Sequence, residues 1–298
     1  MCRRKRDVLL VALLAVVTAA CVTADEQPSS RPAVSVSSTP SATVTATPSQ
    51  TTAPSPSASA SEGGAYLAIG DSLTFGIGAP QPRRDGFPAR LSDHLATAEP
   101  PITETRVLAV PGETASGFLE HRLGDVLLAI DELGDRVELV TIGLGANELL
   151  RIRREPACEV DPHGEACVTA VTAATGEAAD ALDAVVASVQ DALEADGSDA
   201  RILLLAYYNP DVDPIAVSTV VGTDGIVACE PNDAAPGLDD RIACVAETRR
   251  VELVDLYAAF LGREAELTRA GAGDVHPNAA GYAVIADAIL HVLEETSP

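Results

Sequence analysis

Residues 66–76 read Tyr66-Leu67-Ala68-Ile69-Gly70-Asp71-Ser72-Leu73-Thr74-Phe75-Gly76, an apolar run that ends in a small polar turn. Apolar residues bounded by glycine are typical of a buried strand. A serine in the turn directly after a parallel strand lies at the carboxyl edge of the sheet, where α/β proteins bind ligands. Ser72 is therefore a candidate nucleophile, although Gly-Asp-Ser is also ordinary turn chemistry.

The chain from residue 65 to 298 alternates strand-like and helix-like patterns. Apolar strand-like runs occur at 66–69, 106–110, 137–142, 202–206 and 251–256, and the clearest helical patterns lie at 88–98, 168–195 and 279–295. Such alternation predicts an α/β domain, in which a doubly wound parallel sheet carries helices on both faces. The length of this part is sufficient for one domain with a full core.

Three later segments add chemistry to the strand pattern: Val107-Leu108-Ala109-Val110-Pro111-Gly112, then Leu139 to Ile142 with Gly143-Leu144-Gly145-Ala146-Asn147-Glu148, and finally Val275-His276-Pro277-Asn278. With the Gly-Asp-Ser-Leu turn they resemble, in order, the four sequence blocks of the SGNH hydrolases, also called GDSL esterases and lipases. The resemblance covers about Tyr66 to Leu293. It implies a flavodoxin-like three-layer α/β/α sandwich with a five-stranded parallel sheet, and a serine hydrolase. Because the sequence has no Gly-rich phosphate loop, metal cluster or cofactor signature, we expect it to need no cofactor and no metal.

The resemblance also implies roles for single residues. A serine hydroxyl needs a base, and acyl transfer needs donors aimed at the oxyanion that forms. We expect Ser72 to be the nucleophile, His276 the base, and the oxyanion hole to consist of the backbone N–H groups of Ser72 and Gly112 with the side-chain amide of Asn147. The alternatives are that Gly112 is only a turn glycine and Asn147 only a capping residue.

The third member of the catalytic set departs from the family pattern. The family usually has aspartate three residues before the histidine, and Gly273 occupies that position here, with Asp274 one residue later. Either Asp274 orients His276 from a shifted loop, or a backbone carbonyl near Gly273 does so. Glu148 follows the block asparagine where aspartate is common, and we interpret it as structural.

Six cysteines are present, and two of them, Cys2 and Cys21, belong to the N-terminal region. An even number of remaining cysteines in an exported protein predicts two disulfides. Three pairings are possible, and the sequential bridges of the family favour Cys158–Cys167 and Cys229–Cys244. A zinc site is the alternative, although no Cys-x-x-Cys or paired histidine accompanies these cysteines.

The N-terminal region is typical of an exported protein. Residues 1–20 combine basic side chains with a short apolar run, as in a signal peptide of the lipoprotein type, and a short membrane anchor is the alternative. Thr18-Ala19-Ala20-Cys21 resembles a bacterial lipobox, which predicts lipidation of Cys21 and a surface lipoprotein rather than a freely secreted enzyme. Residues 21–64 are rich in Ser, Thr, Pro and Ala and predict a disordered linker, so that 65–298 is the catalytic domain.

Charge and composition limit the partners. The net charge of −24 opposes binding to nucleic acid and to anionic surfaces, and the absence of Trp gives little material for a sugar-stacking platform. We expect a monomeric esterase or lipase that cleaves short or medium acyl esters, from a lipid or an acylated glycan, through an acyl-enzyme. The alternatives are an acyltransferase to a cell-envelope glycan and a non-enzymatic binding lipoprotein. Candidate pocket walls are Leu73, Phe75, Phe87, Phe118, Leu149, Tyr207, Tyr208 and Pro210.

Overall fold

The structure is a computed structural model, and it describes residues 63–210, 229 and 236–295. These residues belong to one compact unit, Pro56–Pro298. The signal peptide, Cys21 and nearly all of the linker lie outside the described residues. None of the helices within the described ranges combines the length and the apolar character needed to cross a membrane.

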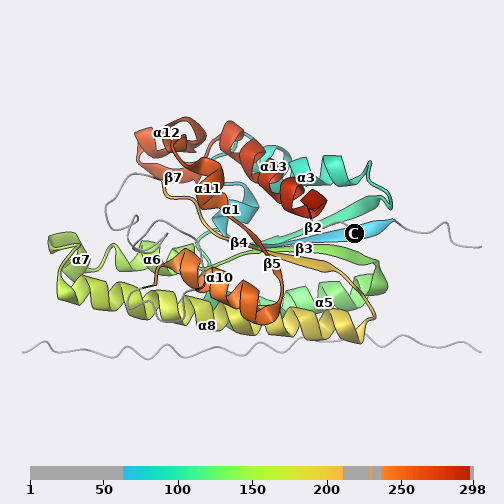
Figure 1. Ribbon diagram of the computed structural model, residues 1–298, viewed down its shortest axis with the longest axis horizontal. Coiled ribbons are helices and arrows are strands. Elements are labelled where there is room, and N and C mark those ends of the chain that lie inside the picture. Colours follow the sequence, from blue (N-terminus) through green and yellow to red (C-terminus); the bar gives the residue numbers. More distant parts are fainter. Residues whose placement is uncertain (1–62, 211–228, 230–235, 296–298) are drawn as a thin grey trace, which may run out of the picture. The chain divides into compact units, whose positions relative to one another are not determined.

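Five parallel strands form the central sheet, as the alternating pattern predicts (Figure 1). The strands are β1 (Gly64–Gly70), β2 (Ile102–Ala109), β3 (Val137–Gly143), β4 (Arg201–Leu205) and β5 (Glu252–Val254). Their order is β2-β1-β3-β4-β5, which confirms the doubly wound α/β fold. The chain reverses its direction of winding between β1 and β3, and such a switch point opens a crevice at the carboxyl edge of a sheet.

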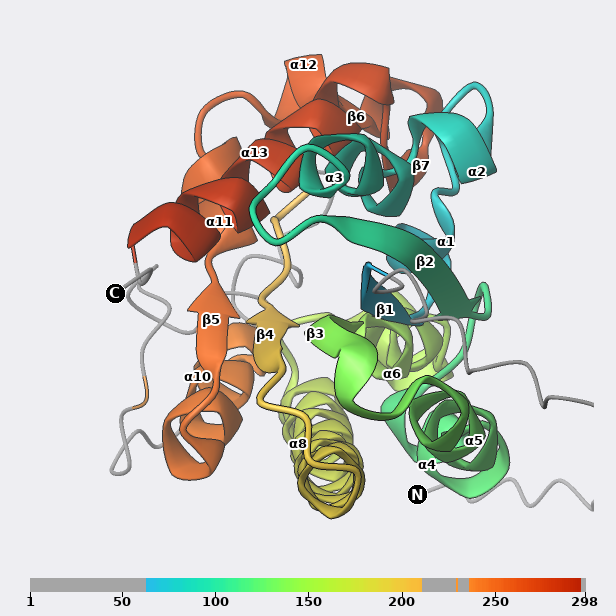
Figure 2. The ribbon, with the colours of Figure 1, turned by 90° about the vertical axis from the view of Figure 1, so that its right-hand side faces the viewer.

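Helices cover both faces of this sheet, and Figure 2 shows the two layers. One layer contains α3 (Phe87–Leu95), α11 (Leu256–Phe260), α12 (Glu264–Leu267) and α13 (Ala279–Glu295). The other contains α4 (Ala115–His121), α5 (Leu123–Leu133), α8 (Glu165–Ala195) and α10 (Leu238–Arg249). The short helices are α1 (Ser72–Phe75), α2 (Pro82–Asp85), α6 (Ala146–Ile152) and α7 (Pro156–Val160), and short 3₁₀ turns span Gly134–Arg136 and Ala270–Ala272.

The longest helix, α8, shows why the layers adhere to the sheet. Its buried residues recur every three or four positions, and they include Val171, Ala178, Val185 and Val189. That spacing places an apolar stripe on one face of a helix with 3.6 residues per turn. Strand β1 lies at the centre of the sheet and is buried from Ala65 to Gly70, so the serine turn extends directly from the middle of the core.

The boundaries of the second and fifth strands differ from the sequence-based expectation. β2 begins at Ile102, four residues before the apolar run, because its first half pairs with the start of β1. β5 ends at Val254, since the side chain of Asp255 accepts a hydrogen bond from the N–H of Ala258 and starts α11 there. Strand β2 is therefore longer than its apolar run, and the polar side chain of Asp255 ends β5 before its apolar run is complete.

Both expected disulfides are present. Cys158 of α7 is bonded to Cys167 of α8, and Cys229 is bonded to Cys244 of α10. All four cysteines of the described part therefore belong to disulfides, and the alternative that they bind zinc does not apply.

Candidate active site

Ser72 lies at the carboxyl edge of the sheet, as the first residue of α1. The carboxylate of Asp71 accepts a hydrogen bond from the N–H of Leu73 (2.8 Å) and so caps this single helical turn. Gly76 ends the turn in the left-handed region (φ 94°), where a side chain would overlap the carbonyl of Pro82. These two residues hold the hydroxyl of Ser72 just outside the buried strand.

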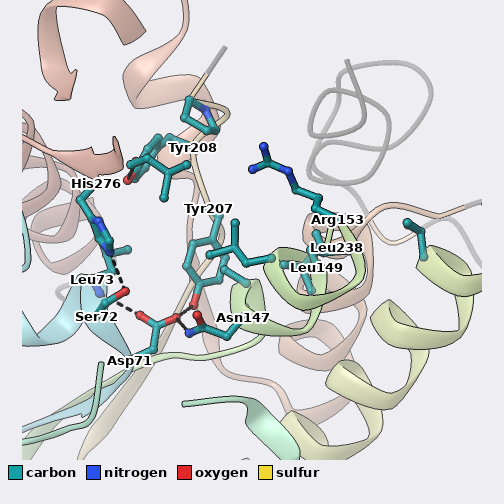
Figure 3. Close-up of a pocket in the computed structure, with 15 residues that line it drawn as sticks. Asp71, Ser72, Leu73, Asn147, Leu149, Arg153, Tyr207, Tyr208, Leu238 and His276 are labelled. Carbon is teal, nitrogen blue, oxygen red and sulfur yellow. Dashed lines mark hydrogen bonds between the residues drawn. The ribbon is translucent and has the colours of Figure 1, made fainter. Parts of the chain in front are cut away.

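His276 reaches Ser72 from the other end of the chain. It belongs to β7 (Asp274–Pro277), which pairs antiparallel with β6 (Thr268–Arg269) in a small second sheet. His276 Nε2 lies 2.9 Å from Ser72 Oγ, and with the ring proton on Nδ1 it accepts the hydroxyl proton (Figure 3). The two residues predicted as nucleophile and base are thus within hydrogen-bonding distance.

Asp274 lies on the opposite side of the imidazole ring. The Nδ1 of His276 is 2.6 Å from Asp274 Oδ1, which also accepts the backbone N–H of His276. Arg269 Nε is 3.0 Å from the other carboxylate oxygen. Partial burial alone would raise the pKa of Asp274, but the hydrogen bonds from His276 and the nearby charges hold it below its ordinary value, so the carboxylate is ionised at neutral pH.

Gly273 explains the shifted position of the acid. It follows the 3₁₀ turn Ala270–Ala272 and has a φ of 73°, a left-handed conformation that a glycine adopts without strain. The backbone reverses at this residue and turns the next side chain, that of Asp274, toward the imidazole. Of the two sequence-based alternatives, the geometry favours the carboxylate of Asp274 over a backbone carbonyl near Gly273.

The predicted oxyanion donors surround Ser72, but one of them is already engaged. Ser72, Gly112 and Asn147 line one cleft together, and Gly112 has a φ of 79° with open space where a side chain would begin. The side-chain amide of Asn147, in the first turn of α6, donates to Asp71 Oδ2 (3.1 Å) and to the carbonyl of Glu113 (2.8 Å). An oxyanion would therefore share one of these amide hydrogens.

Asp71 is a site residue that sequence reasoning missed. Its side chain is buried beside Ser72, and its Oδ2 accepts from both Asn147 and the hydroxyl of Tyr207 (3.0 Å). Burial raises the pKa of Asp71 to about 7, although the hydrogen bonds from Leu73 and Tyr207 oppose the shift. Asp71 stands in the Gly-Asp-Ser turn itself, but its partner Tyr207 is 136 residues away and could not be identified from the sequence.

Glu148 has the structural role expected for it. Its Oε1 accepts the backbone N–H of Ala115 (2.7 Å) at the start of α4, and the side chain is buried. Burial also raises the pKa of Glu148. The remaining histidines, His94, His121, His163 and His291, are exposed and none of them lines the cavities beside Ser72.

Two cavities meet at Ser72. One is a mainly apolar pocket of about 80 Å³, and its walls include five of the expected residues, Leu73, Leu149, Tyr207, Tyr208 and Pro210 (Figure 3). The other is a wider, more polar cleft of about 1160 Å³. Phe87 and Phe118 were wrong as pocket walls because they are fully buried in the core, and Phe75 lines neither cavity.

No group of three or more His, Cys, Asp or Glu residues arranged to hold a metal ion occurs within the described residues. The chemistry that this geometry supports is that of a serine hydroxyl, an imidazole base and an ionised carboxylate in a row.

A known protein family matches the greater part of this chain. The model of the GDSL-like Lipase/Acylhydrolase family matches residues 68–284. A comparison with curated proteins finds no matching sequence.

Solved structures share the fold at low identity. A lipase from a goat rumen metagenome is 20% identical, with a TM-score of 0.55 over 77% of this chain and 97% of the other. An acetylxylan esterase from Geobacillus stearothermophilus is 19% identical, with a TM-score of 0.52 over 78% and 94%. A phospholipase A1 from Streptomyces albidoflavus NA297 is 20% identical, with a TM-score of 0.51 over 79% and 100%.

Proposed function

The chain belongs to the GDSL-like lipase/acylhydrolase family and is a hydrolase of ester bonds, and from that premise we propose that it cleaves esters of short acyl chains through an acyl-enzyme on Ser72. The single observation that carries this proposal is the chain of contacts from Ser72 Oγ to His276 and from His276 to Asp274. It opens onto a mainly apolar pocket of about 80 Å³. A pocket of that size suits a short acyl chain.

The proposed reaction begins when Ser72 Oγ attacks the ester carbonyl and its proton passes to His276 Nε2. Asp274 then stabilises the imidazolium, because a full negative charge lies 2.6 Å from Nδ1. The oxyanion accepts hydrogen bonds from the N–H groups of Ser72 and Gly112 and from the amide of Asn147. His276 returns its proton to the leaving alcohol, and water releases the acid by the same steps in reverse order.

Replacement of the nucleophile tests this proposal. Ser72→Ala should abolish both the hydrolysis of p-nitrophenyl butyrate and labelling by a fluorophosphonate probe, while circular dichroism and the melting temperature stay close to those of the wild type. Ser116→Ala is the matched control, because Ser116 is an exposed serine that lines neither cavity. Labelling of a folded Ser72→Ala protein would exclude Ser72 as the nucleophile.

Acyl transfer to a cell-envelope glycan is the second candidate, since the cleft beside Ser72 is large enough for an acceptor other than water. Formation of a new ester when an acceptor alcohol is added, at the expense of free acid, would distinguish transfer from hydrolysis. The assembled contacts of Ser72, His276 and Asp274 argue against a non-enzymatic binding role.

We also propose that residues 65–298 are the catalytic domain of an exported lipoprotein, with 1–20 as signal peptide and 21–64 as lipidated cysteine and linker. The two disulfides support export, since such bonds persist in oxidising compartments. Lipidation of Cys21 rests on the sequence alone.

A further inference from the structure

The wide cleft beside Ser72 is lined by three arginines from one short segment, Arg151, Arg153 and Arg154. They lie at and just after the end of α6, the helix whose first turn carries Asn147. The cleft also contains Gly112 and His276, so the arginines and the reacting groups face the same space.

The spacing of these residues along the helix places two arginines in line with Asn147. Arg151 and Arg154 follow Asn147 by four and seven positions, which is one face of a helix. The helical turn continues past Ile152, because the N–H of Arg154 donates to the carbonyl of Arg151. Arg151 therefore starts about one turn, roughly 6 Å, farther along the axis than Asn147, and Arg154 lies beyond the end of α6.

Arg151 is also fixed beside the oxyanion loop. Its Nη2 donates to the carbonyl of Gly112 at 3.3 Å. The positive charge of Arg151 therefore lies beside Gly112, the residue whose backbone N–H we assign to the oxyanion hole.

The charges around the cleft leave Arg151 and Arg154 available to an anion. Within the described residues neither forms an ion pair, although the charge of Arg151 also acts on the carboxyl of Glu148, whose pKa burial raises and this charge lowers; by contrast, Arg106, Arg201 and Arg249 each bind a carboxylate. Two carboxylates also line the cleft: that of Asp274 is engaged by His276 and Arg269, and that of Glu159 is exposed. The three arginines outnumber the two carboxylates that line the cleft, so the cleft has a local surplus of positive charge in a chain whose net charge is −24.

We infer that the alcohol part of the ester substrate carries a phosphate group, which binds Arg151 and Arg154 in the cleft while the acyl chain occupies the apolar pocket. This inference rests on the proposed function. Guanidinium groups bind phosphate through paired charge-assisted hydrogen bonds, and one phosphate has enough oxygens for two arginines.

The reaction itself is unchanged by this assignment. The bond between the acyl carbon and the ester oxygen breaks, water supplies the hydroxyl of the acid and the proton of the alcohol, and the phosphate ester stays intact. The arginines discriminate between substrates through the leaving alcohol.

A matched pair of esters tests the inference. The probes are 1-butyrylglycerol and 1-butyrylglycerol 3-phosphate, which share the acyl group and differ in one phosphate. At low salt the wild-type protein should have a kcat/KM at least tenfold higher for the phosphate ester. In the double variant Arg151→Gln/Arg154→Gln the ratio of the two kcat/KM values should fall at least tenfold. Arg84→Gln is the control, since Arg84 is exposed and lines neither cavity.

A second measurement does not require turnover. Glycerol 3-phosphate should slow fluorophosphonate labelling of Ser72 in the wild type and not in the double variant, and glycerol should slow it in neither. Vesicles of phosphatidylglycerol form a further arm: release of fatty acid from vesicles identifies a lipid substrate, and release of butyrate from the soluble ester alone identifies a soluble phosphate ester. Either result supports the inference when the double variant releases less acid than the wild type, and equal release by the two proteins contradicts it.

Equal kcat/KM values for the two esters in the wild type, or an unchanged ratio in a folded double variant, would overturn it. Those results leave ester hydrolysis and Ser72 labelling intact, so they differ from a failure of the proposed function, in which neither ester is cleaved and Ser72 is not labelled.

Discussion

Asp71 is buried beside the nucleophile and accepts three hydrogen bonds, from Leu73, Asn147 and Tyr207. The hydrogen bonds favour the ionised carboxylate, and burial favours the neutral acid. Since burial is the larger effect, the pKa rises from 3.8 to about 7. The residue next to the nucleophile therefore changes charge close to neutral pH.

This pKa makes the stability of the protein depend on pH. Between about pH 4 and 7 the unfolded chain has already released the proton of Asp71 while the folded chain retains it, so the free energy of unfolding falls as pH rises through this range. A shift of this size corresponds to at most about 4 kcal/mol. We expect Asp71→Asn to remove this part of the decline, as measured by urea unfolding from pH 4 to 8.

The control for that series is Asp93→Asn, because Asp93 is exposed. The pH dependence of Asp93→Asn should match that of the wild type. A wild-type slope that persists in Asp71→Asn would show that other carboxyl groups cause the decline.

Asp274 allows a separate test of the group that orients His276. A carboxylate stabilises the imidazolium, and its loss in a serine protease costs about 10⁴-fold in kcat. Because the structure places Asp274 Oδ1 2.6 Å from His276 Nδ1, we expect Asp274→Asn to lower kcat by orders of magnitude with little change in KM. A loss below about tenfold would instead assign the orienting role to a backbone carbonyl.

At the scale of elements, the β6–β7 hairpin and the start of α13 carry the base as one unit. Asn278 joins them: its N–H donates to the carbonyl of Leu267 (2.9 Å), and its Oδ1 accepts the N–H of Ala280 (2.8 Å). Gly281 follows in the first turn of α13, where a side chain would overlap the carbonyl oxygen of Leu267 and lie 2.8 Å from Pro277 Cβ.

Gly281→Ala should therefore push the hairpin and the helix apart. We expect the variant to lose about 1–3 kcal/mol of stability from overpacking, and roughly 10- to 100-fold in kcat/KM because His276 moves away from Ser72. Thermal unfolding and ester hydrolysis measure the two effects. Gly271→Ala is the matched control, since its added methyl group meets nothing within 4 Å; equal activities of the two variants would contradict the prediction.

The elements differ in how far the sequence predicts them. All five strands of the main sheet were predicted, because each is an apolar run that the chain interrupts with glycine or a polar turn. The hairpin that carries His276 was not, since two-residue β6 has no periodic pattern and is defined by its pairing with β7. For the same reason the sequence located Ser72 and His276 but not the contact between Asp71 and Tyr207, which depends on how the ends of β1 and β4 pack.

At the scale of the whole molecule, the strongly acidic composition determines how the proposed attachment to a membrane can be tested. A chain with a net charge of −24 has no electrostatic attraction to an anionic membrane, so stable association depends on lipid at Cys21. Cys21→Ser should shift the protein from the membrane fraction to the soluble fraction or to a form that retains residues 1–20. Fractionation with detergent partitioning measures this, and identical distributions would favour secretion or a retained anchor.

The contact between His276 and Ser72 joins residues 204 positions apart, with strands β2 to β5 of the sheet between them in the chain. A ribosome that adds about 5–20 residues per second needs roughly 10–40 s to pass from the serine to the histidine. During that interval the growing polypeptide has a nucleophile and no base, so a nascent chain cannot attack esters in the compartment where it is made. The order of the residues along the chain thus delays activity until synthesis is nearly complete.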